Sequence, residues 1–359
     1  MVWNPLQLLF SKKYLGIDIG TSFIKIVEIS KFGHRKRLEN YGELSSEALY
    51  EKPFRTFERN SLFLSSKDIS RAIRAIMEEA KIKTHQAVFS IPDFSTFYTT
   101  FDLPQMSREE LEQAVRYEAR QHVPLPLGEV TLDWQLIKGK PGQRETKIKI
   151  LLVAVPNEII NQYRKIIQLS KLKLVALEAE VFGLIRALAD EDEKRPVAII
   201  DIGAQSTTCN IVDKKILVSS YSFDMSGNDL TKIIAKSLNV NYQEAEDLKN
   251  KYGLLSGKEL DIGQILLPLV DVILGETNKN FNNFYQTGGE EIKKIILAGG
   301  TALLPGLKEY FTRNLKAETE VAYPFTDIFF PPILENTLKD MGPGYAIAVG
   351  MALRGLEHQ

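Results

Sequence analysis

Hydrophobic residues along the chain alternate between a strand-like and a helix-like spacing. Short apolar runs at residues 151–155 and 295–297 have the length and β-branched content of buried strands. Between such runs lie amphipathic stretches, as at residues 69–80, where apolar positions recur every three or four residues. Strands that alternate with helices over most of a chain predict an α/β fold.

One helix boundary is marked by its capping residues. Ser107 is followed three residues later by Glu110, the spacing of a capping box, and an amphipathic pattern runs from there to His122. Pro124 and Pro126 then prevent the helix from continuing. The sequence therefore predicts a helix over residues 107–122. Residues 35–63 are rich in charged and aromatic side chains, and their path is not predicted.

Length and charge narrow the class of protein. The 359 residues are too many for one ordinary core and suit two lobes. Lys and Arg (45) nearly balance Asp and Glu (46), so the net charge of -1 gives no electrostatic reason to expect a nucleic acid partner. The single cysteine, Cys209, has apolar or small neighbours and is interpreted as a buried thiol in a reducing compartment.

The first residues form a short apolar tail. Residues 2–10 are apolar, and basic residues follow them instead of preceding them, unlike a secretory signal peptide. The tail is either an interfacial or partner-docking segment, or a tail that is folded onto its own domain or left disordered. No apolar run in the sequence reaches the roughly 18 residues of a spanning helix.

A short motif occurs twice, once in each half of the chain. In both copies an apolar strand leads into Asp-Ile-Gly followed by hydroxyl residues, and a second apolar strand follows. One copy alone is typical of an ordinary β-hairpin turn, but two copies on buried strands favour a shared function. The residues are Asp18, Gly20, Thr21 and Ser22 in the first copy, and Asp201, Gly203, Gln205, Ser206 and Thr207 in the second.

The chemistry of these turns suits phosphate and magnesium. A tight glycine turn exposes backbone N–H groups that can hold phosphate oxygens, and the hydroxyls add neutral donors. Asp18 and Asp201 would be repelled by phosphate, but each can hold Mg²⁺ through water, since Mg²⁺ keeps several waters when bound. Two such turns across a cleft would grip a di- or triphosphate from both sides. The sequence contains no Walker-type phosphate loop.

A third glycine-rich element follows the apolar run at 295–297. Gly299, Gly300 and Thr301 come directly after this strand and precede a helix that begins near Pro305. Paired glycines at such a turn let a flat ring or a ribose lie on bare backbone. The three elements together predict a nucleotide site between two lobes.

In this order the three loops resemble the actin-like ATPase superfamily: first phosphate loop, second phosphate loop, adenosine loop. The segment from Ser226 to Gly253 is similar to the bacterial FtsA, MreB and PilM branch, and residues 101–134 and 344–356 resemble the PilM family in particular. The resemblance implies that Gly227, Glu246 and Lys249 lie beside ribose and adenine. The chain departs from the family pattern at Ala204 and Gln205, where small polar residues or glycine are typical, so Gln205 either narrows the site or contacts phosphate.

The resemblance implies an α/β actin-like fold: two ribonuclease H-like lobes around a nucleotide cleft, with an inserted α/β subdomain. It assigns residues 1–13 to an N-terminal tail, 92–146 to the inserted subdomain, and 14–91, 147–190 and 340–359 to the first lobe. Residues 195–339 form the second lobe, with 227–294 as its helical subdomain.

In actin-like enzymes that hydrolyse ATP, a Glu or Gln at the start of the linking helix positions the attacking water. Glu178 is the best match here and Glu180 is the alternative. Either carboxylate could instead serve only the helix dipole. At most slow hydrolysis is expected, with ATP and Mg²⁺ as ligands.

The PilM resemblance further implies a scaffold of type IV pilus assembly. Such a protein lies in the cytoplasm at the inner-membrane face and grips the N-terminal cytoplasmic tail of a PilN-like membrane protein, so its membrane association is indirect. Contact with pilus motor ATPases and self-association are further expectations. The alternatives are an FtsA-like filament-forming membrane anchor and, less favoured, a small-molecule kinase. The inserted segment gives no clear pocket pattern for the catalytic aspartate of a kinase.

Overall fold

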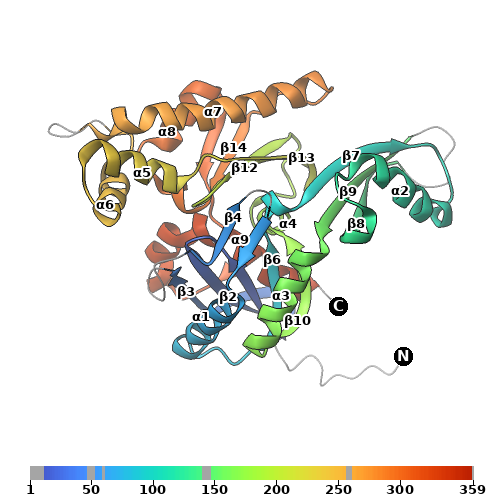
Figure 1. Cartoon of the computed structure of the whole chain (residues 1–359), viewed down its shortest axis with the longest axis horizontal. Helices are drawn as coiled ribbons and strands as arrows, with labels where there is room; N and C mark the ends of the chain where they lie inside the picture. The colour runs from blue at the N-terminus through green and yellow to red at the C-terminus, as the bar shows by residue number, and fades with distance from the viewer. Residues whose placement is uncertain (1–11, 47–52, 59–60, 140–146, 256–260, 358–359) are drawn as a thin grey trace.

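The chain folds into two lobes, one above the other, with a smaller unit that projects from the side (Figure 1). The structure is a computed structural model and describes residues 12–46, 53–58, 61–139, 147–255 and 261–357. Each lobe is built on its own mixed β-sheet. The predicted α/β alternation is therefore present.

The first lobe contains a sheet in the order β10-β6-β1-β2-β3-β16. Strands β1, β2 and β3 form an antiparallel meander, while β6 runs parallel to β1, and β10 parallel to β6. The bounds are Lys12–Ile19 (β1), Phe23–Phe32 (β2), Arg35–Ser45 (β3), Gln86–Ile91 (β6), Lys173–Ala179 (β10) and Ile328–Phe329 (β16).

The second lobe repeats this arrangement. Its sheet has the order β13-β12-β11-β14-β15, again with an antiparallel meander of three strands followed by two parallel ones. The bounds are Val197–Ile202 (β11), Thr207–Asp213 (β12), Ile216–Phe223 (β13), Lys294–Ala298 (β14) and Glu318–Val321 (β15). The duplicated sequence motif thus corresponds to a duplicated hairpin, β1-β2 and β11-β12.

Two helices lie between the sheets and join the lobes. These are α4 (Glu180–Leu188) and α9 (Glu335–Glu357), whose apolar side chains share one core cluster with residues of both sheets, including Ile199 and Ile296 of the second. They cross at Gly183 and Gly350, where a Cβ on Gly350 would lie 2.0 Å from the carbonyl oxygen of Gly183. Glycine is required at this crossing because any side chain would separate the two helices.

The outer faces of the sheets are covered by the remaining helices. In the first lobe α1 (Ser66–Glu79) and α3 (Asn157–Ser170) pack together and onto the sheet. In the second lobe the covering helices are α5 (Gly227–Leu238), α6 (Tyr242–Tyr252), α7 (Ile262–Gln286) and α8 (Leu307–Leu315). Cys209 is fully buried in the core of this lobe, and burial raises the pKa of its thiol to about 12.

The projecting unit, called the inserted subdomain below, is a three-stranded antiparallel sheet backed by one helix (Figure 1). It contains β7 (Phe97–Leu103), α2 (Arg108–His122), β8 (Val130–Lys138) and β9 (Ile148–Pro156). The predicted capping box is confirmed, since the Ser107 hydroxyl accepts from the Glu110 N–H and the Glu110 carboxylate accepts from the Ser107 N–H.

Four features of the chain path differ from the sequence analysis or extend it. Strand β9 pairs with β7 and β8, although residues 147–190 were assigned to the first lobe, because its apolar pattern alone cannot identify its pairing partner. Strand β16 pairs with β3 of the first sheet, although it lies within residues 195–339, which were assigned to the second lobe. The unassigned segment supplies β3 and a small hairpin, β4 (Arg55–Glu58) and β5 (Ser61–Leu64). Of the predicted tail, residues 1–11 lie outside the described residues, and Lys12 and Lys13 belong to β1.

Candidate functional site: a cleft between the lobes

A cavity of about 420 Å³ opens between the two lobes, at the ends of the duplicated hairpins. It brings together most of the residues predicted from the sequence. Those that line it are Asp18, Gly20, Thr21, Ser22, Asp201, Gly203, Gln205, Ser206, Gly227, Glu246, Lys249, Gly299, Gly300 and Thr301, together with Glu180. Thr207 does not line it, because its hydroxyl donates to the Met225 carbonyl oxygen at 2.6 Å.

The two glycine turns face each other and have the same geometry. The Gly20 N–H donates to the Phe23 carbonyl oxygen at 2.8 Å, and the Gly203 N–H donates to the Ser206 carbonyl oxygen at 3.0 Å. The Thr21 hydroxyl donates to Oε1 of Gln205 at 3.3 Å, which links one lobe to the other. Gln205, the departure from the family pattern, therefore contacts the opposite turn and narrows the cleft.

Three carboxylates converge on the floor of the cavity. Asp18 lies at the end of β1, Asp201 near the end of β11, and Glu180 at the start of α4. Oδ1 of Asp18 accepts from the Ser90 hydroxyl at 2.8 Å. Burial, with the nearby charges of Glu180 and Asp18, raises the pKa of Asp201 to about 7. The buried carboxylates thus disfavour the ionised form of Asp201, and a hydrated divalent cation between Asp18 and Asp201 would favour it, so the donor set fits Mg²⁺.

The structure distinguishes the two candidate catalytic glutamates. Glu178, the first choice from the sequence, is held outside the cavity by Arg186, whose two terminal nitrogens lie 2.7 and 3.0 Å from its carboxylate oxygens. Arg354 adds a third contact at 3.3 Å. Glu180 is the residue that faces the cleft, so the geometry favours the alternative.

Arg55 is a cavity residue that the sequence analysis missed. It comes from β4, is 9% exposed, and its Nη1 donates to Oε1 of Glu180 at 2.7 Å. Its Nε donates to the Thr21 hydroxyl at 3.5 Å. Burial raises the pKa of Glu180, and the ion pair with Arg55 partly offsets this effect. The only signal in the sequence was a basic residue in an irregular segment, which does not point to a site.

At the opposite end of the cavity, Lys249 organises the surface predicted to hold ribose and adenine. Lys249 is 4% exposed, and its Nζ donates to Oε2 of Glu246 at 2.7 Å and to the Thr231 hydroxyl at 2.9 Å. It also donates to the carbonyl oxygen of Gly227 at 3.3 Å. The lysine thereby joins α6 to the start of α5 and fixes the orientation of the Glu246 carboxylate.

The glycine pair completes this end. A Cβ on Gly300 would meet nothing within 4 Å, so its backbone faces open space in the cavity. Gly299 has φ +85° and follows β14 directly. Bare backbone next to open space is what a ring or sugar needs in order to lie flat. The cavity therefore combines two glycine turns, a floor of buried carboxylates and a shelf of bare backbone at Gly299 and Gly300, and this combination fits a nucleoside polyphosphate with Mg²⁺.

A comparison with protein families identifies the family of this chain. The family described as type IV pilus assembly protein PilM matches residues 16–356. The chain belongs to this family. The resemblance to PilM found in residues 101–134 and 344–356 is thus confirmed over nearly the whole sequence.

Solved structures of similar fold agree with the PilM assignment. The chain is similar to a structure of the PilM-PilN type IV pilus biogenesis complex, with a TM-score of 0.82, 24% identity, and coverage of 96% of this chain and 98% of that one. It is also similar to MreB5 of Spiroplasma citri bound to AMPPNP, with a TM-score of 0.53, 13% identity, and coverage of 95% of each chain. At these identities the likeness establishes the fold, and the predicted actin-like architecture is confirmed.

Sequence relatives extend to cell division proteins. FtsA of Enterococcus faecalis is 23% identical over 351 residues, which cover 84% of this chain and 78% of the relative. FtsA of Enterococcus hirae is 25% identical over 353 residues, which cover 84% of this chain and 77% of that protein. This PilM-family chain therefore lies in the actin-like branch that contains FtsA and MreB.

Proposed function

We propose that this chain is an ATP-binding scaffold of the type IV pilus assembly platform, which docks the N-terminal cytoplasmic tail of a PilN-like inner-membrane protein. Membership of the PilM family supports the role in pilus assembly. The similarity to one chain of a PilM-PilN complex, over nearly the full length of both, supports the choice of partner. The observation that carries the nucleotide claim is the cavity between two matching glycine turns.

Each end of the cavity has a distinct task in the proposed complex. Backbone N–H groups and hydroxyls of the two turns would bind the phosphates, and Glu246, Gly299 and Gly300 would hold the nucleoside. Asp18 and Asp201 would hold Mg²⁺ through its water ligands. A cation held by these two carboxylates would supply positive charge to offset the negative charge of the phosphates.

The surroundings of Glu180 favour a binding role over rapid turnover. A general base must be free to accept a proton from water, but Glu180 is buried and its Oε1 is 2.7 Å from Arg55 Nη1. If Glu180 acts as the base, release from Arg55 would free this oxygen to accept the proton. We therefore propose that ATP mainly sets the shape of the scaffold and that hydrolysis is slow.

The proposed position is the cytoplasmic face of the inner membrane, reached through the partner. In the part of the chain that the structure describes, no helix has both the length and the apolar character to cross a bilayer. Attachment through the tail of a membrane protein requires no such helix. Contacts with pilus motor ATPases and self-association stay part of the proposal.

The decisive experiment measures partner binding as a function of nucleotide. A fluorescently labelled peptide with the N-terminal cytoplasmic sequence of the PilN-like protein is titrated with the full chain, with and without Mg·ATP, and anisotropy reports binding. A scrambled peptide is the control. We expect saturable binding that differs between the two states. No peptide binding in either state would overturn the partner claim. If calorimetry shows that ATP is bound but the peptide affinities with and without ATP are equal, the claim that ATP sets the shape is overturned.

The FtsA relatives motivate a second candidate, a filament-forming membrane anchor. It predicts that the isolated protein, without any partner, sediments with anionic vesicles and polymerises on them with Mg·ATP. Absence of both effects, together with peptide binding, favours the scaffold.

A further inference from the structure

The inserted subdomain is attached to the first lobe beside the cavity. Its entry runs from β6 through Pro92 and the short 3-10 turn Asp93–Ser95 into β7. This turn is tightly closed, because the Pro92 carbonyl oxygen accepts from the Ser95 N–H and hydroxyl and from the Thr96 hydroxyl, at 2.8 to 3.1 Å. Because the turn is rigid, a displacement of the turn would move β7 with it.

The same turn is bonded to Glu180, the carboxylate that faces the cleft. The Asp93 N–H donates to Oε2 of Glu180 at 3.2 Å, while Oε1 of Glu180 holds Arg55. In return, Oδ1 of Asp93 accepts from the Val181 N–H at 3.1 Å. The first turn of α4 and the root of the inserted subdomain thus hold each other through two buried hydrogen bonds.

Arg55 reaches the turn by a second route. Its guanidinium lies over the ring of Phe94, with its Cζ 5.3 Å from the ring centroid. On the side of the subdomain, the Tyr98 hydroxyl of β7 donates to Oδ1 of Asp93 at 2.6 Å. One buried cation in the wall of the cavity therefore contacts the turn directly through Phe94 and indirectly through Glu180.

An incoming polyphosphate changes this balance. Arg55 lines the same cavity as the two glycine turns and is in hydrogen-bond contact with Thr21 of the first one. The terminal phosphate of a bound triphosphate would compete with Glu180 and Phe94 for the guanidinium, because charge-assisted bonds from arginine to phosphate are strong and often bidentate. Any movement of Arg55 toward the phosphate weakens its hold on the turn.

We propose that Arg55 detects the terminal phosphate and that the turn Asp93–Ser95 transmits its movement to the inserted subdomain, so that the orientation of the subdomain depends on the nucleotide. Phe94, Asp93 and Tyr98 are positioning residues in this arrangement. The inference rests on the proposed nucleotide binding, and it adds the route by which bound ATP alters the scaffold.

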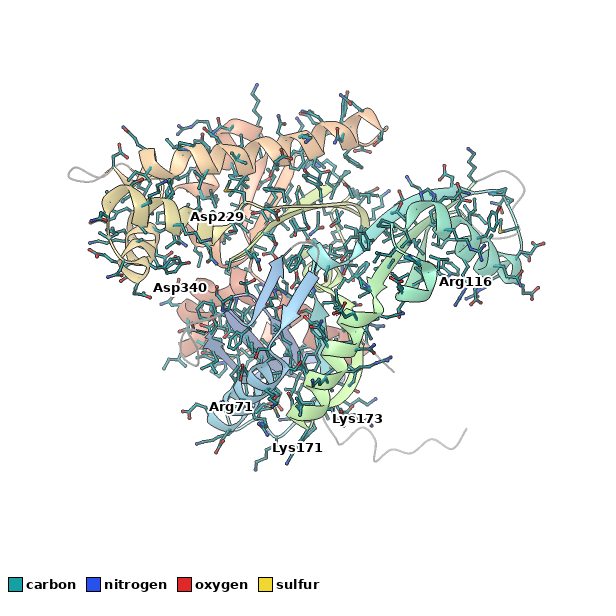
Figure 2. All side chains as sticks on the ribbon, viewed as in Figure 1. Arg71, Arg116, Lys171, Lys173, Asp229 and Asp340 are labelled. Carbon is teal, nitrogen blue, oxygen red and sulfur yellow. The ribbon has the colours of Figure 1, made fainter. Side chains whose placement is uncertain are left out.

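Spin labels can measure the orientation directly. Arg71 on α1 of the first lobe and Arg116 on α2 of the inserted subdomain are both exposed and lie on separate units (Figure 2). Nitroxides are attached to the double variant Arg71→Cys/Arg116→Cys, and double electron–electron resonance gives the distance between them. Cys209 is fully buried, so the introduced cysteines take the label. A pair at Arg71→Cys and Lys173→Cys, both exposed on the first lobe, is the internal control (Figure 2).

We expect the Arg71/Arg116 distance distribution to shift with Mg·ATP or a non-hydrolysable analogue and to stay at the nucleotide-free distribution with ADP. The Arg71/Lys173 distribution should be the same in all three states. Phe94→Leu keeps apolar volume but removes the ring under Arg55, and Tyr98→Phe removes only the hydroxyl. Both should abolish the shift, alone or combined, while ATP affinity changes by less than about threefold, since neither residue lines the cavity.

The matched control is Tyr221→Phe, which removes a tyrosine hydroxyl that donates to Glu276 at 2.9 Å in the second lobe. It should retain the full shift. A shift preserved in the Phe94→Leu/Tyr98→Phe variant, or no shift in the wild type with ATP bound, would overturn the inference. A melting temperature that falls in step with the lost shift would indicate only a structural role. Calorimetry that detects no ATP binding at all would instead overturn the proposed function, and this inference with it.

Discussion

Gly300 offers the most direct test of the cavity as a nucleoside site. A Cβ at this position meets nothing within 4 Å, and the backbone is in an ordinary conformation, so Gly300→Leu should fold normally. The leucine side chain would occupy the shelf on which the nucleoside is proposed to lie. Loss of on the order of 100 Å² of ligand burial costs about 2.5 kcal/mol at ~25 cal/mol per Å². ATP affinity should therefore fall by roughly 50-fold, at about 1.4 kcal/mol per factor of ten.

Substitution of the neighbouring glycine, Gly299, should lower the stability of the fold, in contrast to Gly300→Leu. Gly299 has φ +85°, and a Cβ there would lie 2.5 Å from both Oδ1 of Asp201 and the Ile202 carbonyl oxygen. Gly299→Ala therefore adds backbone strain and overpacking, which together cost roughly 3 kcal/mol. The melting temperature should fall by about 5 °C or more.

Isothermal titration calorimetry with Mg·ATP and thermal unfolding without nucleotide measure the two effects separately. Gly275→Leu is the matched control, because Gly275 is an exposed glycine on α7 whose Cβ would also meet nothing within 4 Å. It should leave ATP affinity unchanged and should not lower the melting temperature, since leucine favours a helix more than glycine does. Wild-type ATP affinity in Gly300→Leu would refute the assignment of the shelf, and an unchanged melting temperature in Gly299→Ala would refute the packing argument.

Three further predictions concern the acidic groups around the cleft. Asp18→Ala should abolish Mg²⁺-dependent ATP binding in calorimetry, and undiminished binding would contradict the proposed cation site. The pKa of Asp201, raised to about 7, lies above its unfolded value, so the folded state retains a proton that the unfolded state loses and stability falls as pH rises from 4 to 7. Between pH 5 and 7, without nucleotide, the wild type should lose about 2 kcal/mol of unfolding free energy relative to Asp201→Asn, at ~1.36 kcal/mol per pH unit. Urea denaturation measures this free energy, and the same pH dependence in the wild type and in Asp201→Asn would refute the prediction. Glu178→Gln should lower the melting temperature by roughly 3 °C, because its contacts to Arg186 are weakened, and should leave ATP hydrolysis unchanged. Glu180→Gln should instead lower the hydrolysis rate. A steady-state ATPase assay in which only Glu178→Gln lowers the rate would restore Glu178 as the catalytic candidate.

Much of the site was predictable because its chemistry is local in sequence. An Asp-Ile-Gly turn after an apolar strand already contains the glycine, hydroxyls and carboxylate that a phosphate site uses, and it occurs twice. The strands β11 and β14 are parallel neighbours, so the second turn and the glycine pair at Gly299 and Gly300 end at the same edge of one sheet. The first turn belongs to the other sheet, and it meets them through the packing of the two lobes. The capping box at Ser107 was predictable for the same reason, since all its partners lie within four residues.

Tertiary structure decided what depends on contacts between distant segments. Glu178 and Glu180 are two residues apart with similar local sequence, and only the positions of Arg186, Arg354 and Arg55 determine which carboxylate faces the cleft. Thr207 lies in the motif, but its hydroxyl is taken by a carbonyl 18 residues away. Strand β9 has the pattern of any buried strand, and its partners became known only from the register. The sequence alone thus determined the family, the two-lobed architecture and the paired glycine turns, because these are encoded in short contiguous patterns. The catalytic candidate, the arginine beside it and the attachment of the inserted subdomain required the fold, because each arises from side chains that are far apart along the chain.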